Sequence, residues 1–270
     1  MSIFKHSEDK IPVTIFFIIL LADLIVYFNV DNIWFLASWF ILMTFPKGNV
    51  CSWNHHHQHY FTFKNPISNR LLEIIFGLQT GITGYAWVLH HNYGHHLNYL
   101  NQSKDESRWM KKNGKTMNRI RYGLEVTLTS YYRCFIVGLK HPKILKSFLF
   151  MAILTFGIVG LLFYYRPLPA LFVFILPMIT GLYLTADATY PHHSGLDTNN
   201  ELEASRNITN SKSFNLLSGN LGYHTAHHMK FGIHWSKLPD YHNKIKDQIP
   251  DHCFVDPILP YRIIDKVLKL

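Results

Sequence analysis

Histidines gather in three short segments of this 270-residue chain. The segments read NHHHQH at 54–59, HHNYGHH at 90–96 and HTAHH at 224–228, and a smaller PHH lies at 191–193. Neutral imidazole is a ligand for zinc, copper, iron and nickel alike. Three such clusters in one chain predict a metal site rather than isolated packed or solvated histidines.

The spacing within each cluster suits a helix, because residues four apart share one helical face. The pairs with this spacing are His55 with His59, His91 with His95, and His224 with His228. His96 and His227 each adjoin a member of a pair but are rotated by about 100° from it. One metal takes about three or four protein ligands. Eight or more imidazoles that point in two directions therefore predict two neighbouring metals.

Two apolar stretches lie between the second and third clusters. Residues 147–165 and 168–186 each contain 19 residues without a charge. A helix of that length is about 28 Å long, close to the hydrocarbon thickness of a bilayer. The segment YYRPLP at 164–169 separates them, so they are expected to form a transmembrane hairpin with a short loop.

A second hairpin is predicted near the start of the chain. Its spans are residues 11–30, in which Asp23 is the only charge, and residues 33–46. Residues 33–46 are short for a span, so we expect this helix to depend on its aromatic flanks or to continue into the aqueous phase. Asp23 is expected to lie near the outer end or to pair between helices, or else to serve a function inside the membrane.

The charges of the loops predict the orientation. Between Lys47 and Lys146 there are 14 Lys or Arg residues and four Asp or Glu residues. The positive-inside rule then places the N-terminus, this middle segment and the C-terminal tail in the cytoplasm, with a bacterial inner membrane as the expected location. Residues 71–89 contain polar residues and three glycines, so they are read as an interfacial helix that supports the second cluster.

These observations predict one fold. The chain is expected to be an all-α integral membrane protein forming a single domain over residues 1–270, with four transmembrane helices in two hairpins. A cytoplasmic helical cap would carry the histidine-rich di-metal site. The net charge of +9 is attributed to anionic lipid headgroups rather than to nucleic acid, because no nucleic-acid motif accompanies it. Three isolated cysteines predict neither a disulfide framework nor a thiolate metal site.

The order of these motifs resembles the integral-membrane fatty acid desaturase superfamily, which also includes alkane hydroxylases and carotenoid ketolases. The resemblance covers roughly residues 11–245. It rests on HHHQH, HNYGHH and HTAHH interleaved with two hairpins, and it is strongest where four further segments follow in order. These segments are TYPHHSG, ELEASRNI, NLGYHTAHH and HWSKLPDYH.

The resemblance implies a non-haem di-iron centre, with O2 as co-substrate. The implied metal ligands are His55, His59, His91, His95, His96, His193, His224, His227 and His228. His192 is an alternative to His193, and His56 or His57 is an alternative to His55. Acidic side chains near the clusters are expected to orient the imidazole N–H groups. The candidates for this role are Asp187, Glu201 and Glu203.

The implied reaction is oxygen-dependent desaturation of a fatty acyl chain, with electrons from a separate ferredoxin, rubredoxin or cytochrome b5. The first cluster lacks the aspartate usual after its first histidine, and HHNYGHH at 90–96 is closer to what alkane hydroxylases carry. Hydroxylation of an alkane or acyl chain and oxidative decarboxylation therefore stay open. A histidine-rich metal-binding or transport protein is a weaker rival, since residues 147–165 and 168–186 hold no ionisable ligand.

Overall fold

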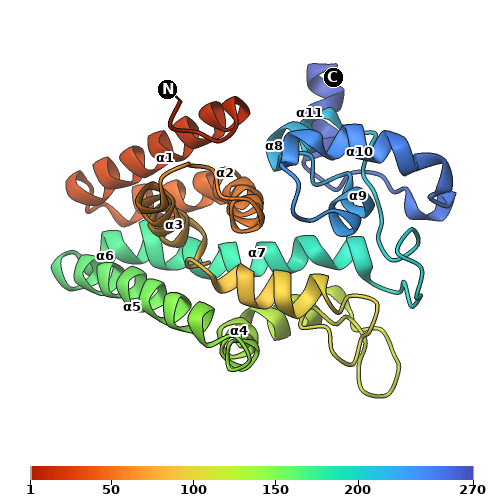
Figure 1. The fold of residues 1–270 in the computed structure, drawn as a ribbon. Coiled ribbons are helices and arrows are strands. Elements are labelled where there is room, and N and C mark those ends of the chain that lie inside the picture. The colour runs from red at the N-terminus through yellow and green to blue at the C-terminus, as the bar shows by residue number, and fades with distance from the viewer. Residues whose placement is uncertain (1, 270) are drawn as a thin grey trace. The chain divides into compact units, whose positions relative to one another are not determined.

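The computed structural model describes residues 2–269, and in that range it contains helices and no strand. Figure 1 shows the order of the elements along the chain. The α-helices are α1 (Lys10–Asn29), α2 (Ile33–His59), α3 (Pro66–Thr80), α4 (Arg119–Gly138), α5 (Pro142–Tyr165), α6 (Pro167–Ala170), α7 (Leu176–His193), α8 (Lys212–Ser218), α9 (His224–Met229), α10 (Leu238–Ile245) and α11 (Tyr261–Leu268). Two segments are π-helices, η2 (Val88–His96) and η3 (Leu171–Ile175). Four short 3-10 helices complete the set: η1 (Ser7–Asp9), η4 (Trp235–Lys237), η5 (Lys246–Gln248) and η6 (Asp251–Cys253).

The described chain packs as two compact units. The first unit contains the residues up to Leu89 together with Thr129–Thr185, and the second contains His90–Leu128 together with the residues from Ala186 onwards. We expected one domain over the whole chain. That this pair of units acts as a single membrane domain stays a prediction.

Three helices within the described residues are long and apolar enough to cross a membrane. They cover Ser7–Asn29, Pro142–Tyr165 and Pro167–His193. Each overlaps a span expected from the sequence. The last one continues seven residues beyond the expected end at Ala186 and so carries the PHH segment on its final turn.

The fourth expected span, residues 33–46, is the first half of α2. The helix continues through Pro46 to His59, which agrees with the second of the two expectations, continuation beyond the span. Its entry into the aqueous phase stays a prediction. Its second half is polar and holds the histidines of the NHHHQH segment, residues 54–59. Helix α2 therefore lacks an apolar stretch of full bilayer length. Four spans and a cytoplasmic cap therefore stay predictions.

The first unit is held by apolar side chains of several helices. One cluster joins Tyr27 of α1, Leu36 of α2, Leu78 of α3 and Phe174 of η3. A second cluster joins α1, α2 and α3 around Phe16, Met43, Leu72 and Phe76. Such close-packed contacts fix the direction of α2, and with it the direction of the histidines on its last turns.

A buried ion pair lies inside the first unit. The Lys47 ammonium of α2 is 2.8 Å from the Asp23 carboxylate of α1. It also donates to the Val173 carbonyl at 2.9 Å, and Trp39 Nε1 donates to Asp23 at 3.0 Å. Of the roles considered for Asp23, this contact supports pairing between helices.

The helix expected over residues 71–89 has different bounds. α3 begins at Pro66, where the Asn65 side chain accepts a hydrogen bond from Ile67 N at 2.7 Å, and it ends at Thr80. Gly81 stops it with a left-handed backbone (φ 73°), and a Cβ there would collide with the Met178 carbonyl. Residues 81–87 are not one continuous helix, and a separate helix starts at Val88. The expectation of one helix to residue 89 was therefore wrong.

Candidate metal centre

The histidines of the HHNYGHH segment, residues 90–96, lie on a π-helix, η2, rather than on an α-helix. A π-helix bonds each residue to the fifth along the chain, so residues five apart share a face. His91 Nε2 and His96 Nε2 accordingly lie 3.0 Å apart. We expected His91 to share a face with His95. The rings of His91 and His95 are neighbours, with centroids 5.1 Å apart, but His91 groups with His96 and His95 with His193 and His228.

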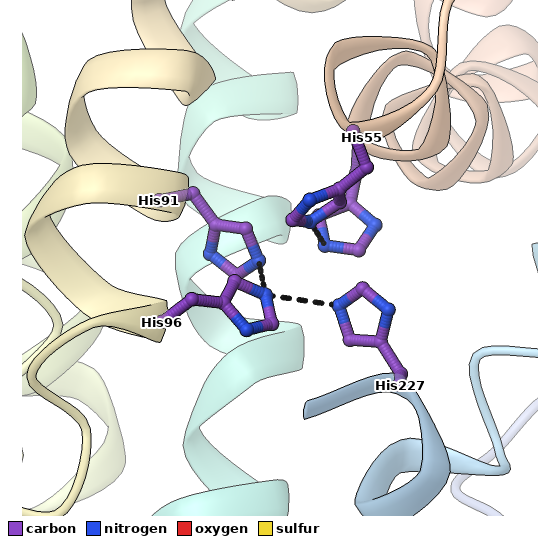
Figure 2. Close-up of side chains that lie close together, drawn as sticks. His55, His91, His96 and His227 are labelled. Atoms are coloured by element: carbon purple, nitrogen blue, oxygen red, sulfur yellow. Dashed lines mark hydrogen bonds between the residues drawn. The ribbon is translucent and has the colours of Figure 1, made fainter. Parts of the chain in front are cut away.

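His91 and His96 form a three-imidazole cluster with His227 of α9, which we call the first cluster. His96 Nε2 is 3.1 Å from His227 Nε2, and one ligand nitrogen from each of the three rings lies within 4.8 Å of the others. Figure 2 shows that the rings of His91 and His96 point toward that of His227. Three ring nitrogens that converge at this distance match the ligand number of a metal site.

The second cluster contains His95, His193 and His228, whose ligand nitrogens lie within 4.8 Å of one another. His224 adjoins it, with its Nε2 3.0 Å from His193 Nε2. The ring centroids of His96 and His228 are 4.3 Å apart, so the first and second clusters are neighbours within the second unit. Seven of the nine predicted ligands are thus brought together there, all of them buried.

Helix α9 supplies both clusters, as its spacing predicted. His224 and His228, four residues apart, lie on the side of the second cluster with ring centroids 4.8 Å apart. His227 turns toward the first cluster instead. The difference follows from the rotation of about 100° per residue in an α-helix.

Hydrogen bonds to the other ring nitrogen orient two members of the second cluster. His193 Nδ1 donates to the Ala204 carbonyl at 3.0 Å, and His95 Nδ1 lies 2.8 Å from the Asp105 carboxylate. A carbonyl or a carboxylate accepts only, so each Nδ1 carries the proton and each Nε2 keeps its lone pair. The lone pairs therefore face the interior of the cluster, as metal ligands require.

Asp105 was missed by the sequence interpretation, and the acidic residues proposed for its role do other things. Asp187 accepts from the Arg119 guanidinium, and Glu203 accepts from the Asn200 amide at 2.9 Å. Glu201 is exposed. The segment ELEASRNI contributes the backbone carbonyl of Ala204 instead. Backbone carbonyls leave no signal in residue types, and the loop from His96 to Asp105 has no periodic pattern from which its path follows.

The PHH segment distinguishes its two histidines. His193 belongs to the second cluster, while His192 does not. The His192 ring stacks on His224 with centroids 4.0 Å apart, and its Nδ1 donates to the Arg206 carbonyl at 2.7 Å. His192 therefore packs against His224, the neighbour of the second cluster, and is not itself a member of that cluster.

Tyr99 adds an aromatic side to the second cluster, and the sequence interpretation missed it too. Its ring centroid lies 4.4 Å from that of His228. Its hydroxyl is buried and has no hydrogen-bond partner among the described residues. Burial and the charge of Glu201 raise the pKa of Tyr99, so the phenol keeps its proton at neutral pH.

The remaining two predicted ligands, His55 and His59, belong to α2 in the first unit. Their Nε2 atoms are 3.2 Å apart on successive turns, which confirms the expected four-residue pairing. His57 points elsewhere, with Nδ1 2.9 Å from Thr62 Oγ1 and Nε2 3.6 Å from the buried Glu73 carboxylate. The geometry therefore favours His55 over His57 as the partner of His59.

Gln58 connects this part of α2 to the start of η2. Its Oε1 accepts from Trp87 N at 2.9 Å and from Val88 N at 3.3 Å, and its Nε2 donates to Asn54 Oδ1 at 2.8 Å. Backbone N–H groups at the beginning of a helix, such as these two, have no partner within that helix. The polar face of α2 thus provides the partners that the first residues of η2 need.

The second cluster has the properties of a site for a transition metal. His95 Nε2 and His228 Nε2 are buried and have no hydrogen-bond partner among the described residues. A buried polar atom without a partner costs free energy, and a bound cation would satisfy both. Burial, followed by the charges of the neighbouring imidazoles, holds the pKa of His228 well below its usual range. The ring is therefore neutral, which is the form that binds metals.

A model of the fatty acid desaturase family matches residues 31–257. The chain belongs to this family. Neither a curated protein nor a solved structure matches it. Family membership and the three apolar helices indicate a membrane protein, and membership supports an oxidoreductase. The histidine clusters agree with the di-iron centre typical of the family, and as individual ligands the nine histidines stay predictions.

Proposed function

We propose that this member of the desaturase family introduces a double bond into a fatty acyl chain with O2 and two irons. The observation that carries the proposal is the pair of adjoining imidazole clusters, the second of which holds the buried Nε2 atoms of His95 and His228 with no hydrogen-bond partner among residues 2–269. When bound, two irons supply the O2 chemistry that removes hydrogen from an unactivated C–H bond, which no side-chain acid or base achieves.

The proposed ligands divide between the two irons. One iron is assigned to His91, His96 and His227, and the other to His95, His193, His224 and His228. His55 and His59, whose Nε2 atoms lie on one helix face of the first unit, complete the nine proposed ligands. The family resemblance implies the same nine ligands.

The residues around the clusters have defined tasks in this proposal. Asp105 and the Ala204 carbonyl hold protons on Nδ1 of His95 and His193, which keeps the opposite nitrogens available. Burial lowers the pKa of His228 well below the usual range and so keeps this ring neutral. Tyr99 closes one side of the second cluster with an apolar ring. Together these contacts prepare the ligand set before any metal is bound.

Hydroxylation of an alkane or fatty acyl chain is the second candidate, with oxidative decarboxylation beside it. The observation that favours it is the spacing H-x3-HH in HHNYGHH, which is closer to alkane hydroxylases. All three reactions begin with the same hydrogen abstraction. They differ in the fate of the carbon radical, so the product distinguishes them.

The electrons are proposed to come from a separate protein such as ferredoxin, rubredoxin or cytochrome b5. The family match occupies residues 31–257 and contains no additional redox motif. The net charge of +9 would favour encounter with an acidic donor by electrostatic steering.

The decisive experiment is a fatty-acid and hydrocarbon profile of cells that express the protein with a donor system. New double bonds support desaturation, whereas hydroxyl groups or terminal alkenes select the other branches. His227→Ala should abolish the product, and His252→Ala is the matched control, since His252 is exposed and outside the clusters. Anaerobically purified protein should hold about two irons. One zinc and no iron would refute the di-iron proposal.

The orientation in the membrane is proposed from the positive-inside rule, with both termini in the cytoplasm. Single cysteines at the exposed positions Lys64, Lys112 and Lys246 test it in a background that lacks Cys51, Cys134 and Cys253. An impermeant reagent applied to intact cells should label none of the three, and should label all of them after lysis. Labelling of one site from outside would contradict the proposal.

A further inference from the structure

Helices α8 and α11 of the second unit pack together through a polar contact. The Asp265 carboxylate of α11 accepts from Ser213 N at 2.8 Å and from the Ser211 hydroxyl. The Ser211 hydroxyl also caps α8 by accepting from Phe214 N at 3.2 Å. Tyr261 packs edge-on against Phe214, with ring centroids 5.0 Å apart. The side of α11 that faces the protein therefore contains its only acidic residue.

The opposite side of α11 is apolar and exposed. Ile263 and Val267, one turn apart, are 53% and 70% exposed. Three further leucines on or beside the two helices are each more than half exposed, namely Leu216, Leu259 and Leu268. A helix on a water-soluble surface shows the reverse arrangement, with its apolar stripe turned inward.

Basic residues border this apolar stripe. Arg262 and Lys266 are exposed and one turn apart, about 100° around the helix from Ile263 and Val267. An apolar stripe beside a basic stripe is the pattern of a helix that lies in the plane of a membrane surface, where anionic headgroups contact the bases. We propose that α11, together with Leu216 of α8, inserts into the headgroup region of a bilayer containing anionic lipid.

Two observations favour lipid over a protein partner. The chain belongs to a membrane family and carries three helices apolar enough to span a bilayer, so a lipid surface is always available to it. In addition, α11 has eight residues, too few for a stable isolated helix in water. Its contacts with α8 hold it in place while leaving the whole apolar stripe uncovered, as permanent contact with lipid requires.

The test uses the full chain in nanodiscs, with a spin label on a single new cysteine at Val267 or, as control, at Lys266. The native cysteines stay in place because all three are buried. In discs that contain phosphatidylglycerol, the label at position 267 should collide more with oxygen than with a water-soluble nickel chelate. The ratio should be inverted at position 266.

Three outcomes would overturn the proposal. Equal nickel access at both positions would show that α11 is in water. Protection that appears only when a ferredoxin or rubredoxin is added would assign the surface to a protein partner. Protection that is the same in pure phosphatidylcholine would remove the role of anionic lipid.

A second measurement avoids the label. Amide hydrogen exchange over residues 259–269 of the unlabelled protein should be slower in discs with phosphatidylglycerol than in discs without it. The double variant Arg262→Gln, Lys266→Gln should lose this difference. If the variant keeps the difference, the basic stripe does not bind the headgroups and the proposal fails. Iron content serves as the folding control in both samples, and the result does not depend on which reaction the enzyme performs.

Discussion

The two units both bury polar side chains, but they satisfy them differently. In the first unit, Lys47 and Asp23 contact each other at 2.8 Å. Asp23 also accepts a hydrogen bond from Trp39, and Lys47 also donates one to the Val173 carbonyl. In the second unit, His95 and His228 present buried Nε2 atoms that have no partner among the described residues. The first arrangement stabilises a fold, whereas the second keeps atoms available for a ligand that the chain itself does not supply.

The largest effect should come from His95→Ala, which should reduce turnover below detection and lower the iron content. The metal-free variant should also lose about 1–3 kcal/mol of stability, because the buried Asp105 carboxylate loses its imidazole partner. Product assay, elemental analysis and thermal unfolding in detergent measure the three quantities. Full activity would remove His95 from the ligand set, and His252→Ala is the control.

Lys47→Met should lower stability without removing a metal ligand. It leaves the Asp23 carboxylate buried without its counterion, which costs about 3–5 kcal/mol of stability. The double variant Asp23→Leu, Lys47→Met should recover most of that loss, because neither charge is then buried. Thermal unfolding measures both, with Lys64→Met at an exposed position as control. A loss no greater than that of the control would show that the ion pair is not structural.

Asp105→Asn should weaken metal binding without removing a ligand. An amide in place of the carboxylate no longer holds His95 with the same charge, and such changes cost about 10–100-fold in metal affinity. Competition with a chelator measures the affinity. Asp187→Asn is the matched control, since Asp187 binds Arg119 and no histidine. Equal losses in the two variants would contradict the role assigned to Asp105.

The smallest effects should distinguish two tyrosines. Tyr131 donates to the Gly81 carbonyl at 2.7 Å in the first unit, so Tyr131→Phe should cost about 1 kcal/mol. The Tyr99 hydroxyl in the second unit has no hydrogen-bond partner in the described part of the chain, so Tyr99→Phe in the metal-free protein should be neutral or stabilising. Unfolding midpoints measure both changes. A loss at Tyr99 as large as that at Tyr131 would show that its hydroxyl is satisfied in solution.

Much of the candidate site was visible in the sequence, because α-helical spacing is a local property. The pairs His55 with His59 and His224 with His228 follow from four-residue spacing on α2 and α9. The different direction of His227 follows from the rotation of about 100° per residue in the same helix. The three apolar helices that match candidate spans were likewise predicted from length and composition alone.

Other features depend on backbone geometry that residue types do not encode. The π-helix of η2 brings Nε2 of His91 to Nε2 of His96, a contact that the α-helical spacing of the sequence did not predict. The end of α3 at Gly81 was also missed. A glycine within an apolar helical pattern stops the helix only where the next element approaches too closely for a side chain, as the Met178 carbonyl does here.

The sequence by itself determined which side chains are present and which of them share a helix face, because those relations repeat every few residues. Only the tertiary structure decided which carboxylate reaches His95, why His193 rather than His192 joins the second cluster, and that Lys47 neutralises Asp23. The Asp105–His95 contact spans 10 positions, and the other contacts join residues of different helices. Their geometry is set by packing of whole elements, and no local pattern in the chain records it.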